Sequence, residues 1–167
     1  MRTSAALLFL LAGCATGSGG GRARDFSLRD MNGKTVRLSD HLGKDVVVMS
    51  FWATWCAPCV AELPHLEKMY QAHRAKGFVV LAISMDGPET VAEVEPTARR
   101  LGLTFPVLFD SETRAVASHN PHRDAPFTVV IDRGGKMVTS KPGYSPGDEV
   151  ELEKQVVALL AGPAPGP

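Results

Sequence analysis

Two cysteines separated by two residues, Cys56 and Cys59, are the side chains of this chain best suited to covalent chemistry. They follow an apolar run from Val46 to Trp52 that is rich in β-branched and aromatic residues, and helical spacing begins at Cys59. The pair therefore falls at a strand-to-helix junction, where a thiol at the start of the helix faces the surface. This arrangement is typical of a redox-active dithiol.

The two sulfurs have different places in the predicted helix. Cys56 lies at its N-terminal edge, where unpaired backbone N–H groups and the positive end of the helix dipole favour a thiolate. Cys59 lies inside the first turn and is partly covered, so we expect Cys56 to attack a disulfide and Cys59 to resolve the mixed disulfide. Pro58 fits between them because a first-turn N–H has no intrahelical partner.

A zinc or copper site is the alternative use of a Cys-x-x-Cys, and it usually draws on a second Cys or His pair. The segment His119-Asn120-Pro121-His122 offers such a pair, although its spacing is tighter than the usual one. A metal-binding or metal-delivery protein that uses Cys56, Cys59, His119 and His122 is therefore one alternative hypothesis. We expect solvated loop histidines instead, and no metal or other cofactor.

The third cysteine, Cys14, ends a segment similar to a bacterial lipoprotein signal peptide. Arg2 precedes a short apolar stretch, and Leu11-Ala12-Gly13 supplies small residues before Cys14. The resemblance implies that residues 1–13 are removed and that the Cys14 sulfur carries lipid. Cys56 and Cys59 would then be the only thiols of the mature chain, so the fold would depend on an apolar core without a structural disulfide.

Composition divides the chain into one domain and two flexible ends. Residues 14–24 form a Gly-rich linker, residues 25–161 are long enough for one apolar core, and residues 162–167 form a Pro- and Gly-rich tail expected to be disordered. With 18 basic and 18 acidic residues, the chain lacks the charge excess of a nucleic-acid-binding protein. We expect a monomer.

Alternating strands and helices are predicted between the flexible ends. A hairpin at 25–39 turns at Asn32-Gly33, and the remaining pattern predicts a helix at 59–76 with Val60, Leu63, Leu66 and Tyr70 on its buried face. Further elements are a strand at 78–84, a helix at 89–101 that Pro96 breaks or kinks, a strand at 105–109, a short helix at 111–118, a hairpin of 127–132 with 136–139, and a helix at 147–160. This order predicts an α/β fold, a mixed central sheet with helices on both faces.

The segment Phe51-Trp52-Ala53-Thr54-Trp55-Cys56-Ala57-Pro58-Cys59, continued by Glu62-Leu63-Pro64, resembles the active-site signature of TlpA/ResA-like membrane-anchored thioredoxins. The resemblance covers roughly residues 25–160 and extends to the related AhpC/TSA-Redoxin group. It implies a thioredoxin-like fold with an N-terminal β-hairpin and an inserted helix and strand after Ile83. The Cys-x-x-Cys alone is weakly diagnostic, whereas its flanking residues make the match specific.

The resemblance also assigns roles around the dithiol. Pro126 matches the family's cis-proline, so Ala125 would be the groove residue that pairs with an incoming peptide, beside Trp55, Ala57 and Pro58. Ser50 stands where many thioredoxins bury an aspartate. Glu62, one helical turn beyond Cys59, matches the glutamate held to manage the proton of the resolving thiol.

These observations predict an extracytoplasmic thiol-disulfide oxidoreductase that is lipid-anchored to a bacterial membrane and faces the periplasm. By resemblance, it reduces disulfides in protein substrates, in cytochrome c maturation or general thiol homeostasis, and is re-reduced by a membrane-bound electron donor. A peroxiredoxin-like peroxidase is the second alternative, because that group shares the Asp-Phe-Ser-Leu opening at residues 25–28. The chain lacks its Pro-x3-Thr-x2-Cys pattern, since Thr54 stands two residues before Cys56.

Overall fold

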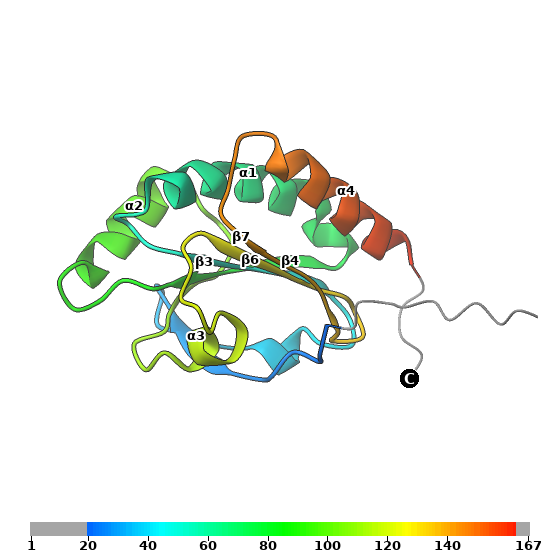
Figure 1. The fold of residues 1–167 in the computed structure, drawn as a ribbon, viewed down its shortest axis with the longest axis horizontal. Coiled ribbons are helices and arrows are strands. Elements are labelled where there is room, and N and C mark those ends of the chain that lie inside the picture. The colour runs from blue at the N-terminus through cyan, green and yellow to red at the C-terminus, as the bar shows by residue number, and fades with distance from the viewer. Residues whose placement is uncertain (1–19, 163–167) are drawn as a thin grey trace, which may run out of the picture.

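The computed structural model describes residues 20–162, which form a seven-stranded sheet between two helical layers (Figure 1). The expected signal peptide, Cys14 and residues 163–167 of the expected tail lie outside the described part. The strand order across the sheet is β2-β1-β5-β4-β3-β6-β7. The strands are β1 (Ser27–Asp30), β2 (Thr35–Arg37), β3 (Val46–Trp52), β4 (Phe78–Ser84), β5 (Val107–Phe109), β6 (Phe127–Ile131) and β7 (Met137–Pro142).

The centre of the sheet is parallel and its margins are antiparallel. β4 pairs in parallel with β3 and β5, whereas β6 runs antiparallel to β3 and β1 runs antiparallel to β5. Every residue of β3, β4 and β6 is buried, which explains why their sequences are apolar runs instead of alternating patterns. The mixed sheet predicted from the sequence is confirmed.

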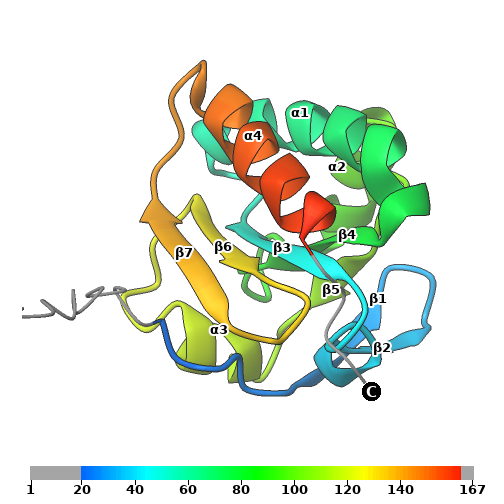
Figure 2. The same cartoon turned by 90° about the vertical axis from the view of Figure 1, so that its right-hand side faces the viewer.

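The helices are α1 (Ala57–His73), α2 (Val94–Arg100), α3 (Arg114–His119) and α4 (Asp148–Ala161). Figures 1 and 2 show α1, α2 and α4 on one face of the sheet and α3 on the other, where it lies close to the first described residues. Each face has its own apolar core: side chains such as Leu63 and Leu66 of α1 fill one, and Val116 of α3 contributes to the other. Helices therefore cover both faces, as expected.

The face of α1 that packs on the sheet differs slightly from the predicted one. Cys59, Leu63, Leu66 and Met69 are buried, whereas Val60 and Tyr70 lie half-buried at the flanks. Because the face is rotated in this way, it also includes Glu62, which is buried. The rotation thus places an ionisable group against the sheet.

Two boundaries differ from the sequence prediction. The predicted helix over 89–101 is a 3-10 turn at Val91–Glu93 followed by α2, and Pro96 lies in the first turn of α2. Proline is tolerated there because a first-turn nitrogen needs no intrahelical acceptor, so α2 continues past Pro96 to Arg100. At the other boundary, residues of the expected linker bind β7 and the turn before it, where Met137 N–H donates to Gly21 O and Ala23 N–H donates to Gly135 O.

Candidate active site

The dithiol sits where β3 gives way to α1, and the structure shows it oxidised. Cys56 and Cys59 form a disulfide with an S–S distance of 2.03 Å and Cα atoms 5.3 Å apart. Cys56 is the N-cap residue of α1, and its sulfur accepts the backbone N–H of Cys59 at 3.3 Å. Cys56 is 6% exposed whereas Cys59 is fully buried, so the cysteine that retains some solvent exposure is the one predicted to attack.

The residues around the disulfide build an exposed rim. Trp55 is 63% exposed, and Ala57 and Pro58 are exposed in the first turn of α1, while Trp52 is fully buried in the core beneath. The turn before Cys56 is held by Thr54, whose N–H and hydroxyl both donate to the carboxylate of Asp86. The hydroxyl of Thr54 is thus occupied in a structural bond, which disfavours the peroxidase-like role for a threonine beside Cys56.

The loop before β6 carries the expected cis-proline, and Ala125 packs against the core cluster that includes both cysteines of the dithiol. The Ala125–Pro126 peptide is cis, as the resemblance implies, and Pro126 O accepts the N–H of Gly143 at 2.8 Å. Asn120 holds the loop that leads to Ala125: its Nδ2 donates to Asp124 O at 2.8 Å and its Oδ1 accepts Asp124 N–H at 3.0 Å. The side chain of Asn120 therefore holds both backbone polar groups of Asp124, the residue before Ala125.

Glu62 is the ionisable group buried behind the dithiol, one turn along α1 from Cys59. It is 4% exposed, and its two oxygens accept hydrogen bonds from different strands: Thr128 Oγ1 donates at 3.0 Å and Ser50 Oγ at 3.4 Å. Burial raises the pKa of Glu62, and the two hydroxyl bonds oppose that rise only in part. A carboxyl group with a raised pKa is suited to proton exchange with a thiol.

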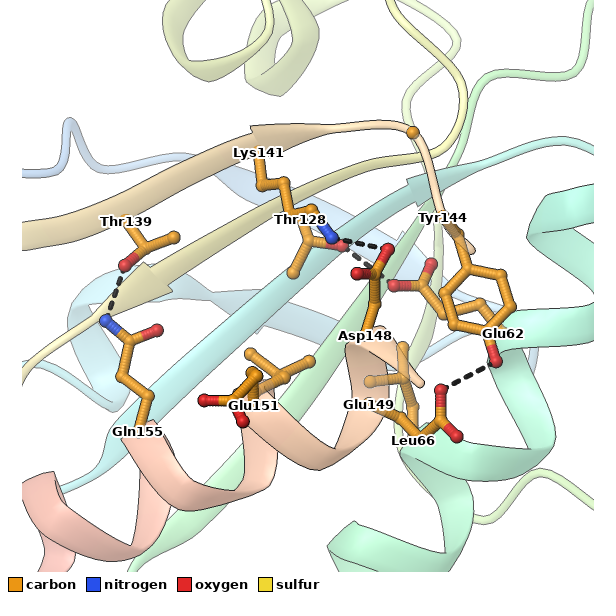
Figure 3. Close-up of a pocket in the computed structure, with 12 residues that line it drawn as sticks. Glu62, Leu66, Thr128, Thr139, Lys141, Tyr144, Asp148, Glu149, Glu151 and Gln155 are labelled. Carbon is orange, nitrogen blue, oxygen red and sulfur yellow. Dashed lines mark hydrogen bonds and ion pairs between the residues drawn. The ribbon is translucent and has the colours of Figure 1, made fainter. Parts of the chain in front are cut away.

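A cavity of about 320 Å³ reaches Glu62 from the side of β7 and α4 (Figure 3). Its rim carries an ion pair between Lys141 and Asp148, and a hydrogen bond of 2.9 Å from the hydroxyl of Tyr144 to Glu149. Burial and the neighbouring Glu149 raise the pKa of Tyr144 to about 12, so it remains a donor at neutral pH. The buried acid therefore borders a cavity whose surface is mainly apolar and whose rim carries charged side chains.

The expectation of solvated loop histidines is wrong for His119. It is 5% exposed, its Nε2 accepts Arg24 N–H at 3.2 Å, and its Nδ1 lies 3.2 Å from Ala115 O, which places the proton on Nδ1. Burial lowers its pKa. Both ring nitrogens are thus occupied, while His122 is exposed, and no group of three or more His, Cys, Asp or Glu side chains within residues 20–162 could hold a metal ion.

Sequence reasoning missed three positioning residues, Thr128, Asp86 and Asn120. A signal existed for Thr128, since it is the one polar residue within the apolar run of β6, and Ser50 is its counterpart in β3. The register pairs Ser50 directly with Thr128. A lone hydroxyl in each of two neighbouring buried strands indicates a shared polar partner.

The chain matches the family model described as the AhpC/TSA family over residues 20–140. It is 35% identical to the thiol-disulfide oxidoreductase ResA of Geobacillus kaustophilus over a match of 132 residues. This match covers 79% of this chain and 74% of that protein. Among solved structures, one from Chlorobium tepidum named for the thiol:disulfide interchange protein DsbE is 33% identical with a TM-score of 0.77, and covers 86% of this chain and 99% of that one. A structure from Bacteroides thetaiotaomicron named for a protein disulfide isomerase is 31% identical with a TM-score of 0.76, covering 88% and 92%.

The fold, the oxidised Cys-x-x-Cys at the start of α1 and these likenesses lead to one conclusion. The chain belongs to the AhpC/TSA family and is a thiol-disulfide oxidoreductase of the thioredoxin fold, with Cys56 and Cys59 as its redox pair.

Proposed function

We propose that the enzyme reduces disulfides in proteins outside the cytoplasm, with Cys56 as the attacking thiol and Cys59 as the resolving thiol. The observation that carries the proposal is the N-cap position of Cys56, whose sulfur receives the N–H of Cys59. In the reduced enzyme the same N–H and the helix dipole would stabilise a Cys56 thiolate. Cys59 is fully buried, which suits a thiol that reacts only within the mixed disulfide.

The reaction proceeds in two exchanges. The Cys56 thiolate attacks one sulfur of the substrate disulfide, so that a Cys56–substrate bond forms and the other substrate sulfur leaves as a thiolate. Glu62 then takes the proton of Cys59, and the Cys59 thiolate attacks Cys56 and releases the second substrate sulfur. Two electrons pass from the enzyme dithiol to the substrate, whose sulfurs end as thiols by taking the proton held on Glu62 and one from solvent.

The groove for the substrate polypeptide is formed by Trp55, Ala57 and Pro58 on one side and by Ala125 on the other. Neither backbone polar group of Ala125 is hydrogen-bonded to the rest of residues 20–162, so both are free to pair with an extended peptide. The small side chain of Ala125 and the exposed indole of Trp55 favour a permissive contact with varied sequences.

A lipid on Cys14 would hold the enzyme at a membrane, and residues 15–20 would let the domain stand away from it. Within residues 20–162, no helix has the length and apolar character needed to cross a bilayer. The resemblance to the TlpA/ResA-like group favours apocytochrome c and other cysteine-containing proteins as substrates, and a membrane electron carrier as donor. Lipid labelling that persists in a Cys14→Ser variant would contradict the anchor.

Alkylation of the reduced enzyme tests the activated thiol. The rate at which Cys56 reacts with iodoacetamide should rise with pH, with a midpoint well below about 8.5, the pKa of an unperturbed cysteine thiol. Cys59→Ser isolates this thiol, and Cys56→Ser is the matched control, in which the buried Cys59 should react slowly. A Cys59→Ser profile with a midpoint at the unperturbed value would contradict the assignment of Cys56 as attacker.

The direction of electron flow is tested by the reduction potential of the Cys56–Cys59 pair. A reductant should have a potential near the thioredoxin value of about −270 mV, whereas a value near −120 mV is typical of a strong oxidant. Equilibration with glutathione buffers, followed by mass spectrometry of the alkylated thiols, gives the value directly. A potential near the second value would overturn the proposed direction and leave the assignment of the two cysteines intact.

A further inference from the structure

The hydroxyl of Thr128 links the strand that follows the substrate groove to the buried acid. Thr128 is 5% exposed and lies on β6, two residues beyond Pro126. Its Oγ1 donates to Glu62 Oε1 at 3.0 Å, a bond drawn in Figure 3, and both side chains line the cavity. No other hydrogen bond of this hydroxyl is made within the described residues.

Thr128 and Ser50 act on Glu62 as a cross-strand pair. Their Cα atoms are direct partners in the antiparallel ladder of β6 and β3, and each hydroxyl donates to a different oxygen of the carboxyl group. The Thr128 bond is the shorter, at 3.0 Å against 3.4 Å, so it restrains Glu62 more strongly. A bond to a charged acceptor is stronger than one to a neutral acceptor, so Thr128 favours the carboxylate over the protonated form.

Other charged and titratable groups approach Glu62 from the remaining elements. Lys141 on β7 favours its carboxylate, while Asp148 on α4 disfavours it. Tyr144, between β7 and α4, and Glu149 of α4 complete the cavity wall, with Glu151 farther along α4. Lys141 and Asp148 form an ion pair with each other, and Tyr144 donates to Glu149, so these groups partly satisfy one another. Thr128 bonds Glu62 directly.

We propose that Thr128 is a positioning residue for the thiol-disulfide exchange: its hydroxyl holds the Glu62 carboxyl group and sets the pH range in which Glu62 accepts the proton of Cys59. The inference rests on the proposed role of Glu62. It also gives a path from substrate to acid, because a polypeptide that pairs with Ala125 contacts the chain three residues before Thr128, across the cis peptide.

Thr128→Val tests the inference because valine keeps the shape and removes the hydroxyl. The measurement is the single-turnover oxidation of the reduced enzyme by insulin disulfides, followed by stopped flow from pH 4.5 to 9. We expect the pH midpoint of the resolving step to move upward, and the rate below that midpoint to fall about tenfold, the effect of one hydrogen bond to a charged group. Thr128→Ser should restore the wild-type profile, and Ser50→Ala should move the midpoint by less.

Two further variants separate the possible failures. In a Glu62→Gln background, Thr128→Val should leave the remaining profile unchanged, because its target is no longer titratable. If Glu62→Gln alters the profile while Thr128→Val and Thr128→Ala do not, Thr128 only fills space and the inference is wrong. If Glu62→Gln itself has no effect, the proposed proton role of Glu62 fails instead.

A direct titration does not depend on catalysis or on one variant's folding. Carbon-13 NMR of the labelled Glu62 carboxyl group should show a higher titration midpoint in Thr128→Val, or in Thr128→Ala where valine prevents folding, and a wild-type midpoint in Thr128→Ser. Equal midpoints in wild type and in the folded variant without the hydroxyl would overturn the inference.

Discussion

Each face of the sheet buries an acidic side chain, and the two carboxyl groups are satisfied by different kinds of donor. On the α3 face, Asp110 is 7% exposed and accepts the backbone N–H groups of Arg114 and Val116 at 2.8 and 2.9 Å. On the α1 face, Glu62 is 4% exposed and accepts from the hydroxyls of Thr128 and Ser50.

The difference in donors matches a difference in role. A backbone N–H can only donate, so it stabilises a carboxylate and leaves the protonated form without a matching partner. A hydroxyl can donate to a carboxylate or turn to accept from a carboxylic acid, and therefore serves both forms. The bonds of Asp110 fix the start of α3, whereas those of Glu62 allow its proton to come and go. Replacing each acid should therefore have opposite consequences for stability and catalysis.

The largest loss of stability should follow Asp110→Ala. The change removes two hydrogen bonds to a charged group and leaves two N–H donors at the start of α3 without their acceptor, which costs about 3 kcal/mol. Urea unfolding of the oxidised protein at pH 7 measures the loss. Glu112→Ala is the matched control, because Glu112 pairs with Arg114 at an exposed site and should contribute ~1 kcal/mol at most. Equal stability in the two variants would remove the structural role given to Asp110, and disulfide reduction per folded molecule should be unchanged in both.

Glu62→Gln should show the reverse pattern in catalysis. The amide keeps the shape of the side chain: one of the two hydroxyls of Thr128 and Ser50 can turn to accept from its NH2 group, while the other still donates to its oxygen. Removing a general base slows the assisted step by about 10²-fold, so single-turnover resolution should slow by this amount and lose the inflection assigned to Glu62. A wild-type rate and profile would reduce Glu62 to a packing residue.

The same substitution should change how stability depends on pH. Burial raises the pKa of Glu62 above 4.5, so between pH 4.5 and the higher folded value the native protein binds more protons than the unfolded chain. The wild type therefore loses stability as pH rises through that window, by ~1.4 kcal/mol per pH unit at most. Glu62→Gln should lack this loss and match or exceed the wild type at pH 7, as measured by urea unfolding at several pH values.

His119 extends the comparison to a base on the α3 face. Burial lowers its pKa from 6.5, so between the folded value and 6.5 the unfolded chain binds more protons, and stability falls as pH drops below 6.5. His119→Gln, whose side chain can still accept the N–H of Arg24, should weaken this acid sensitivity, which is ~1.4 kcal/mol per pH unit at most. Thermal unfolding from pH 5 to 7.5 measures it, with the exposed His65→Gln as control. If the stability of wild type and His119→Gln depends on pH in the same way, the lowered pKa given to His119 is wrong.

Local features and long-range contacts differ in how far the sequence predicts them. The dithiol, the apolar strands and the start of α1 follow from local patterns, because residue spacing and N-cap chemistry act within a few residues. The hydroxyl pair around Glu62 depends on the register between β3 and β6, which joins residues 78 positions apart. In the sequence, His119 is half of a His-x2-His pair that suggests a loop. In the fold it is buried and accepts the N–H of Arg24, which lies 95 residues away in the chain.

The smallest effect should come from Lys141→Met, which asks whether the cavity rim influences Glu62. Lys141 favours the Glu62 carboxylate and neutralises Asp148, which disfavours it. Losing the ammonium group should therefore raise the pKa of Glu62 and move the inflection of the resolving step to higher pH. Lys34→Met is the charge-matched control: Lys34 is exposed just before β2, at the opposite edge of the sheet from β7, and its loss should not move the inflection.

Salt distinguishes a screened effect at this rim from one transmitted through the protein. At 1 M ionic strength the Debye length falls to about 3 Å, so a shift of the pH inflection that Lys141→Met causes through solvent should largely disappear. The shift caused by Thr128→Val should persist, because the hydrogen bond that it removes is buried. Stopped-flow profiles at low and high salt give both results. If salt changes the inflection shifts of Lys141→Met and Thr128→Val equally, the contrast between a direct buried bond and a screened surface charge does not hold. The pKa of Glu62 is then set by β6 and the cavity rim together.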